Sequence, residues 1–245
     1  MLTLLNLTLI VFFLSSCSLN NIRKTMPHEA FVFISGSTTY DSCIKDKKTQ
    51  LKKCKEKTRS FSASGFVVWK NDNTILIVTA EHVCTAPSWA KRKSMNGTTF
   101  YGDKFKLKLI NKNARHDICL LKTEINDTTI IKVVPIAKKK IKIGEKVYNM
   151  AAPDGVFNPG MVPMLEGRYS GMKYEEYIYT IPATFGSSGS PILNENKEAI
   201  GLLSKVYVRF PFISVSPNQP FFRKWLINEI ERYKFSMHPK VFYRF

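Results

Sequence analysis

The chain has 245 residues, enough for one large all-β domain or two small ones that share a core. Its hydrophobic fraction of 44% excludes wholesale disorder. Lys and Arg number 37 against 19 Asp and Glu, a formal net charge of +18, and many of these charges lie in residues 45–59 and 138–146, which we expect to be solvated loops or edges. The excess favours solubility and attraction to anionic envelope surfaces. A specific nucleic-acid partner is not expected, because no aromatic residues alternate with the lysines as a base-stacking surface requires.

The first sixteen residues are almost wholly apolar and end at Leu14-Ser15-Ser16-Cys17. This run is too short to span a bilayer comfortably but suits the apolar region of a secretory signal. Leu-Ser-Ser-Cys also resembles a bacterial lipobox, whose cysteine is acylated and becomes the mature N-terminus. No Lys or Arg precedes the run, so a buried segment or an uncleaved anchor stays open. We expect a signal peptide over 1–16, lipidation at Cys17, a tether over 17–27, and an exported protein that is membrane-anchored, periplasmic or secreted.

Short strand-like runs rich in Val, Ile, Phe and Tyr recur along the chain with turn signals between them. They cover residues 30–34, 63–69, 74–79, 105–110, 118–122, 146–151, 178–181, 192–193, 199–208 and 212–215. One helical pattern follows over 220–233, with an apolar face at helical spacing and a proline at its start. Many short strands and a single C-terminal helix predict an all-β pair of small barrels. No break in composition marks a linker, so the barrels form one folding unit.

Three segments carry residues suited to nucleophilic chemistry. Val78-Thr79-Ala80-Glu81-His82 places a histidine just after an apolar strand, and His116-Asp117-Ile118 places an aspartate at the head of another. Gly186-Ser187-Ser188-Gly189-Ser190-Pro191 is a small-residue turn that can expose the Ser188 hydroxyl. The N–H groups of Gly186 and Ser188 would then face the oxyanion that forms when this hydroxyl attacks a carbonyl.

Taken in this order, the three segments resemble those of the chymotrypsin-fold serine peptidases, over about residues 30–230. Thr-Ala-Glu-His at 79–82 resembles the family's Thr-Ala-Ala-His, and Asp-Ile-Cys-Leu-Leu at 117–121 its Asp-Ile-Ala-Leu-Leu. Residues 186–191 are similar to Gly-x-Ser-Gly-Ser-Pro of bacterial glutamyl endopeptidases and to Gly-Asn-Ser-Gly-Gly of HtrA-like proteases. The resemblance implies a trypsin-like peptidase domain over 28–245. It would consist of two six-stranded antiparallel β-barrels, about 28–135 and 136–245, with the helix in the second.

The resemblance also implies a role for each matched residue. Ser188 is the expected nucleophile, His82 the general base and then general acid, and Asp117 the residue that orients and stabilises the imidazolium. Ser204 is expected to contact the backbone of the substrate residue before the scissile bond and to hydrogen-bond Asp117. His116 is expected to point away from Asp117, because neighbouring side chains alternate along a strand.

Substrate preference is predicted from departures from the family's patterns. The position six before the nucleophile, acidic in trypsin, is Pro182, so a basic substrate side chain would lack a buried counter-ion. Glutamyl endopeptidases usually have a histidine just before the serine matched by Ser204, and here that residue is Leu203. Val206 could narrow the pocket. We therefore expect a small or medium apolar side chain before the cut. Ser187 replaces the aspartate with which trypsin binds its new N-terminus, so activation of that kind is not expected.

Cysteine spacing predicts one local disulfide. If Cys17 is lipidated, four cysteines remain, which allow three pairings. Cys43 and Cys54 flank a lysine-rich polar segment, and we expect a bond between them. Cys84 and Cys119 lie two residues after His82 and Asp117, so they are close if those side chains meet. They form either a second bond or two small buried thiols. Without a CxxC motif, we expect no metal and no cofactor.

The sequence thus predicts an exported serine endopeptidase that hydrolyses protein or peptide substrates through a Ser-His-Asp triad and an acyl-enzyme. Two other classes stay open. One is a catalytically silent protein of the same fold that acts as a binding module in the cell envelope. The other is a basic protein that binds nucleic acid or anionic surfaces.

Overall fold

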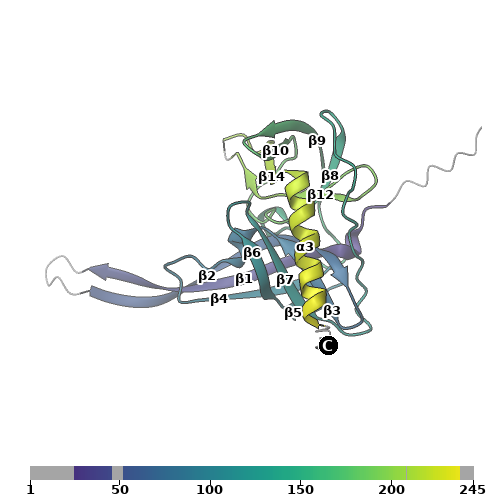
Figure 1. The fold of residues 1–245 in the computed structure, drawn as a ribbon. Helices are drawn as coiled ribbons and strands as arrows, with labels where there is room; N and C mark the ends of the chain where they lie inside the picture. Colours follow the sequence, from purple (N-terminus) through teal and green to yellow (C-terminus); the bar gives the residue numbers. More distant parts are fainter. Residues whose placement is uncertain (1–24, 46–51, 208, 238–245) are drawn as a thin grey trace, which may run out of the picture.

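We analysed a computed structural model of the chain, which describes residues 25–45, 52–207 and 209–237. Two seven-stranded antiparallel sheets follow each other along the chain, and one long helix comes last (Figure 1). This confirms the all-β class with two sheets and a C-terminal helix. The expected signal peptide, Cys17 and most of the tether lie outside the described residues.

The first sheet has the strand order β5-β4-β1-β2-β3-β7-β6. Its elements, with the short helices between them, are η1 (His28–Ala30), β1 (Phe31–Lys45), β2 (Lys52–Lys70), β3 (Thr74–Thr79), α2 (Glu81–Cys84), β4 (Arg92–Thr99), β5 (Lys104–Lys106), β6 (Lys108–Asn113) and β7 (Ile118–Glu124).

The second sheet has the order β12-β11-β8-β9-β10-β14-β13. Its elements and the final helix are β8 (Lys146–Met150), η2 (Pro153–Gly155), β9 (Met164–Lys173), β10 (Glu176–Tyr179), β11 (Pro191–Leu193), β12 (Ala199–Leu202), β13 (Lys205–Val206), β14 (Ser214–Pro217) and α3 (Gln219–Met237).

The apolar strands were predicted well, whereas two polar strands were missed. β3 has the predicted bounds, and β7, β8 and β11 lie where strands were expected. β4 and β9 lack a continuous apolar run, because only alternate side chains of these strands are covered. The predicted runs 105–110 and 199–208 each correspond to two strands, β5 with β6 and β12 with β13. Each sheet has seven strands, one more than the six expected from the resemblance.

The largest difference from the predicted strands is the long β1–β2 hairpin, which projects far from the body of the molecule (Figure 1). Its register runs from Phe31 opposite Phe66 out to Lys45 opposite Lys52. Residues 52–59, predicted as loop or edge, are strand, because cross-strand hydrogen bonds continue well beyond the apolar core. The predicted Cys43–Cys54 disulfide is present and joins directly opposed residues.

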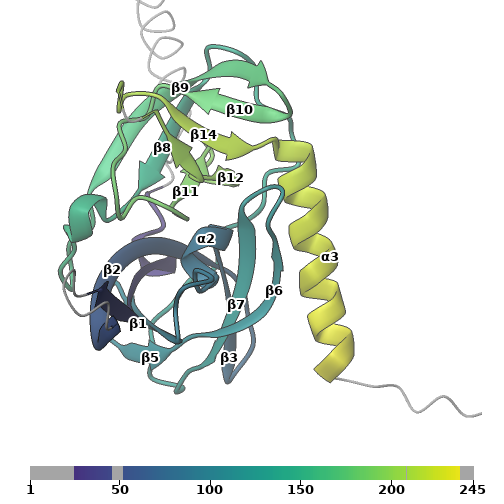
Figure 2. The ribbon, with the colours of Figure 1, turned by 90° about the vertical axis from the view of Figure 1, so that its left-hand side faces the viewer.

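Helix α3 follows the second sheet but covers part of the first (Figure 2). Phe222 and Leu226 are fully buried in the same hydrophobic cluster as the strands of the first sheet, and Tyr233 packs edge-on against Trp69, with ring centroids 6.0 Å apart. The burial of this apolar face stabilises the arrangement of the two sheets. Within the described ranges, no helix is long and apolar enough to cross a membrane.

Candidate active site

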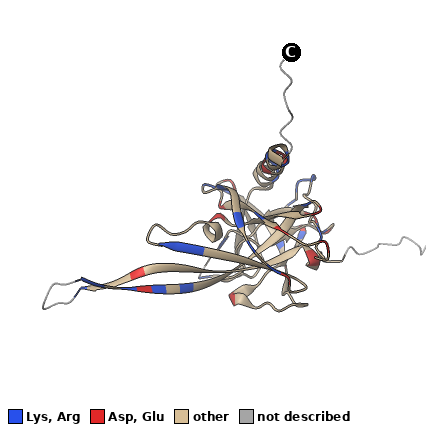
Figure 3. Ribbon diagram, turned by 90° about the horizontal axis from the view of Figure 1, so that it is seen from below, with Lys and Arg blue, Asp and Glu red and all other residues tan. Residues whose placement is uncertain are grey.

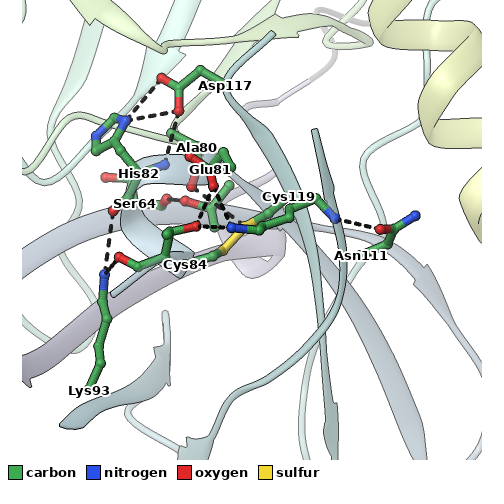
Figure 4. The surroundings of a disulfide bond; sticks show 12 residues. Ser64, Ala80, Glu81, His82, Cys84, Lys93, Asn111, Asp117 and Cys119 are labelled. Atoms are coloured by element: carbon green, nitrogen blue, oxygen red, sulfur yellow. Dashed lines mark hydrogen bonds and ion pairs between the residues drawn. A yellow bond between two sulfur atoms is a disulfide. The ribbon is translucent and has the colours of Figure 1, made fainter. Parts of the chain in front are cut away.

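His82 lies on α2, a single helical turn that begins directly after β3. The Lys93 ammonium on β4 donates hydrogen bonds to the carbonyls of Thr85 (2.7 Å) and His82 (3.4 Å), and burial lowers the pKa of Lys93 (Figure 4). Burial would raise the pKa of Glu81, but hydrogen bonds from Thr85 and Lys112 outweigh it and lower this pKa below its ordinary value. These contacts hold the short helix against β4 and β6.

Asp117 lies in a tight turn just before β7 and has a left-handed backbone, with φ of 51°. Aspartate tolerates this conformation better than most residues. Its carboxylate accepts hydrogen bonds from His82 Nδ1 at 2.9 and 3.0 Å and from the His82 backbone N–H at 3.0 Å (Figure 4). The structure thus brings these two predicted residues together, with the Asp117 side chain 15% exposed and that of His82 50% exposed.

Two expected neighbours of Asp117 contact other residues. The Ser204 hydroxyl donates to the Val215 carbonyl at 3.1 Å, so the expected hydrogen bond to Asp117 was wrong. His116 stacks on Phe221 with ring centroids 3.6 Å apart. It belongs to the turn before β7, so the strand alternation that we used to orient it does not apply.

The turn that carries Ser188 requires glycine on both sides of Ser187-Ser188. Gly186 and Gly189 have φ of +89° and +84°, which disfavours other residues. A Cβ at Gly189 would overlap Thr79 Oγ1, and one at Gly186 would overlap the Ala152 carbonyl. Gly189 therefore lets the Ser188 turn approach β2 and β3 of the first sheet closely, and Gly186 lets it approach the segment that follows β8.

Ser64 on β2 connects the two sheets at this point, and the sequence analysis gave it no role. Its backbone N–H donates to the Ser188 carbonyl at 2.9 Å, and its hydroxyl donates to the Gly186 carbonyl at 2.9 Å while accepting from the Ala152 N–H at 3.0 Å. Thr79 Oγ1 donates to the Ser64 carbonyl at 2.7 Å. Ser64 is completely buried. A buried serine in the apolar run 63–68 is the signal that could have revealed it.

The backbone amides of Gly186 and Ser188 are available for a ligand. Neither amide donates a hydrogen bond to any other described residue. The Phe185 carbonyl belongs to the same peptide unit as the Gly186 N–H, and it accepts a hydrogen bond from the Asp154 N–H at 2.6 Å. Since C=O and N–H point in opposite directions in a trans peptide, the Gly186 N–H is directed away from Asp154.

His82, Gly186 and Ser188 line one cavity of about 480 Å³ between the two sheets. Ser188 and His82 form no direct hydrogen bond in this structure, although such contacts are often long before a substrate binds. The remaining wall residues are Thr38, Arg59, Ser60, Phe61, Ser62, Val83, Pro87, Trp89, Lys93, Asp154 and Phe185. The predicted substrate residues Pro182, Ser204 and Val206 are not among them.

The second pair of cysteines is also bonded. Cys84 on α2 and Cys119 on β7 form a disulfide, which decides the alternative that the sequence left open (Figure 4). The bond joins the helix of His82 to the strand that follows Asp117. Among residues 25–45, 52–207 and 209–237, no group of three or more His, Cys, Asp or Glu side chains could hold a metal ion.

The structure has two antiparallel sheets, with a His–Asp pair on the first and a glycine-flanked serine on the second, and His82 and Ser188 line one cavity between them. This arrangement defines the two-barrel, chymotrypsin-like class of fold. The profile of the trypsin-like peptidase domain matches residues 63–202, and the chain belongs to this family.

Similar proteins include probable periplasmic serine endoproteases described as DegP-like. The protein from Pseudomonas fluorescens is 30% identical over 108 residues, which is 42% of this chain and 22% of that protein. The one from Hahella chejuensis is 24% identical over 152 residues, or 60% of this chain and 30% of that protein. The chain thus spans less than a third of the length of these relatives.

Among solved structures, the serine endoprotease from Yersinia pestis is similar, with a TM-score of 0.60 and 16% sequence identity. The match covers 84% of this chain and 64% of that chain. At this identity the likeness concerns the fold alone, and it agrees with the two-sheet architecture described above.

Proposed function

We propose that this protein is a serine endopeptidase in which Ser188, His82 and Asp117 act as the triad. The observation that carries the proposal is the shared cavity. His82, which is hydrogen-bonded to Asp117, and Ser188 both line it, and the Gly186 and Ser188 amides have no acceptor in the described protein. The DegP-like relatives are named as serine endoproteases, which supports the same reaction.

In the proposed mechanism, Ser188 Oγ attacks the scissile carbonyl while His82 Nε2 takes its proton. The Asp117 carboxylate at His82 Nδ1 fixes the tautomer that can accept this proton, and it stabilises the imidazolium that forms. The Gly186 and Ser188 amides donate to the oxyanion. His82 then protonates the leaving amine, and an acyl-Ser188 ester remains. A water molecule deprotonated by His82 hydrolyses this ester and restores the hydroxyl.

We further propose that substrate residues before the scissile bond lie along β13 and the Ser204 that precedes it. Val206 and Pro182 would then border the pocket for the side chain before the cut. Val206 and Pro182 are both partly exposed, as contact with a substrate requires. With no acidic residue at position 182, a small or medium apolar side chain is the preferred occupant.

The proposal places the enzyme in the cell envelope. Residues 1–16 would act as an export signal, Cys17 would carry a lipid, residues 17–27 would be a tether, and residues 28–245 would form the peptidase domain. Its two barrels would be divided near residue 135, in the segment between β7 and β8. The relatives' names include the word periplasmic, and a disulfide-forming compartment suits the two observed disulfides.

Substitution of the nucleophile and base tests the mechanism. Ser188→Ala and His82→Ala should each lower casein hydrolysis by about 10⁴–10⁶-fold, and the double variant little further, because the triad acts as a unit. Ser170→Ala, an exposed serine on β9, is the matched control and should keep full activity. A fluorophosphonate should label wild type at Ser188 alone. Labelling at another serine, or a folded wild type that neither cleaves nor labels, contradicts the proposal, and the latter result favours a silent binding protein.

A further inference from the structure

One face of the projecting β1–β2 hairpin carries a row of positive charges. We call residues 37–45 and 52–60 the arm. Its register places Thr38 opposite Arg59, and the next same-face pairs outward are Tyr40 with Lys57, Ser42 with Lys55, and Ile44 with Lys53. Because side chains alternate between the faces of a strand, four cations share one face. We call them the basic row: Lys53, Lys55, Lys57 and Arg59.

The basic row begins in the cavity that contains Ser188. Thr38 and Arg59, the innermost pair on this face, both line the cavity, and so does Lys93, the partner of Thr38 on β4. Tyr40 packs edge-on against Trp89 of the cavity wall, with ring centroids 5.1 Å apart. Where the arm begins, the face that carries the row is therefore the face turned toward the site. Figure 3 shows that Lys and Arg continue from there along the projecting hairpin.

The acidic residues of the arm lie on its other face. Asp41 and Glu56 are opposite each other in the register, and ion pairs with Lys91 (2.8 Å) and Arg92 (3.1 Å) already neutralise them. The Cys43–Cys54 disulfide belongs to this face too. In contrast, all four cations of the basic row are exposed, and none forms an ion pair with a described acidic residue. The outermost pair on that other face, Lys45 and Lys52, is also basic, so acids and cations share it, whereas the face of the basic row carries positive charge only.

The spacing of the row suits an extended peptide. Same-face residues of a strand recur every ~6.6 Å, which is also the repeat of alternate side chains in an extended substrate. Ser204 and Val206, on the proposed path for residues before the cut, do not line the arm side of the cavity. The chain that follows the scissile bond would therefore leave Ser188 toward the arm.

We propose that the basic row is an exosite for acidic residues at alternate positions on the C-terminal side of the scissile bond. This rests on the proposed peptidase function and names a substrate class for it. Asp154 lies in the cavity wall, so the acidic residues should begin beyond the positions nearest the cut, where the row moves away from this carboxylate. A nucleic acid could also meet the row, but continuity with the nucleophile's cavity favours a peptide.

Two fluorogenic peptides test the exosite. They would be identical from four residues before the cut to three after it, followed by a (Gly-Asp)₄ or a (Gly-Ser)₄ extension. Wild type should cleave the acidic peptide with kcat/KM about tenfold higher at low salt, and the preference should shrink at 0.5 M salt, because exposed charges are screened within a few ångströms there. The triple variant Lys53→Gln/Lys55→Gln/Lys57→Gln should lose most of this preference, because its kcat/KM falls for the acidic peptide and not for the neutral one.

The matched control removes the same charge elsewhere. Lys138→Gln/Lys139→Gln/Lys140→Gln, on an exposed segment before β8, should keep the full preference. Equal kcat/KM for both peptides in wild type overturns the exosite. The proposal also fails if an acidic extension placed before the cut raises kcat/KM as much as one placed after it. Loss of single-stranded DNA binding in the arm variant, with the peptide preference intact, would make the row a nucleic-acid surface instead.

Binding to an inactive variant separates the exosite from the reaction. Fluorescence anisotropy with Ser188→Ala should show tighter binding of the acidic peptide than of the neutral one, and the arm substitutions should abolish this difference. If neither peptide is cleaved by wild type but this difference is present, the proposed function fails and the anionic site stands. If both peptides are cleaved but no difference in binding or rate exists, the exosite alone fails.

Discussion

At the scale of single residues, Ser64 is the structural link between the turn that carries Ser188 and the first sheet. Its hydroxyl and N–H contact the carbonyls on either side of Ser187, namely those of Gly186 and Ser188, at 2.9 Å each. The two bonded carbonyls belong to the peptide units directly after Gly186 and Ser188, next to the units whose N–H groups are proposed to bind the oxyanion. Ser64 touches no reacting atom, so we regard it as a positioning residue.

Ser64→Ala should lower kcat about 10- to 100-fold with little change in KM, because small misplacements of catalytic groups are costly. It should also cost about 1–3 kcal/mol of stability, since the Ala152 N–H and Gly186 carbonyl lose a buried partner. Val67→Ala on the same strand is a control that destabilises the fold through a cavity instead. If both variants, assayed fully folded, keep wild-type kcat, Ser64 has only a structural role.

At the scale of elements, α2 is too short to be stable alone and depends on its side-chain contacts. Glu81, at its first position, accepts hydrogen bonds from Lys112 Nζ at 2.9 Å and from Thr85. The pKa of Glu81 is lowered in the folded protein, so its carboxylate form is the one that the fold favours.

Glu81→Gln should therefore lower the free energy of unfolding by about 1 kcal/mol at pH 7. The stabilisation by a group with a lowered pKa is present above the unfolded pKa and is lost as the pH falls through the folded one, so the two proteins should converge below pH 4.5. Urea unfolding at pH 7 and pH 3 measures this. Glu195→Gln, at an exposed site, should change neither value. A difference that is the same at both pH values would exclude the carboxylate as its cause.

The arm is the second element whose stability can be tested separately. Cys43 and Cys54 close a short loop, for which a disulfide contributes about 3 kcal/mol in the chain-entropy view. Cys43→Ser/Cys54→Ser should raise hydrogen exchange along β1 and β2 beyond the core and reduce the preference for the acidic peptide. Cleavage of the neutral peptide should change by less than about twofold, because local opening of an exposed hairpin need not reach the site. Unchanged exchange in the arm would show that the strand pairing suffices without the bond.

At the scale of the whole molecule, charge and the proposed lipid act together. A diacylated or triacylated cysteine buries enough methylene groups for stable anchoring, and the net charge of +18 adds attraction to anionic lipid that salt screens. The tethered domain would then face the membrane surface as well as its substrates.

Cys17→Ser should release active enzyme into the soluble fraction or leave an unprocessed precursor, without altering kcat. Fractionation and the mass of the N-terminal peptide measure this, and Ser188→Ala is the control that should stay with the membrane. A Cys17→Ser protein with the wild-type N-terminal mass and unchanged partition would rule out lipidation and favour a plain signal or an uncleaved anchor.

The sequence by itself determined the class of the protein and the positions of the proposed triad. His82, Asp117 and Ser188 each lie in a contiguous motif, and the buried strands and α3 show their periodicity locally, so both are readable along the chain. Only the tertiary structure decided which polar segments are strands and what Ser64 contacts. It also decided that Cys84 is bonded to Cys119 and that the basic row lies on the arm face whose innermost pair, Thr38 and Arg59, lines the cavity. The physical reason is that cross-strand hydrogen bonds and opposed pairs stabilise polar strands, and those partners are distant in sequence.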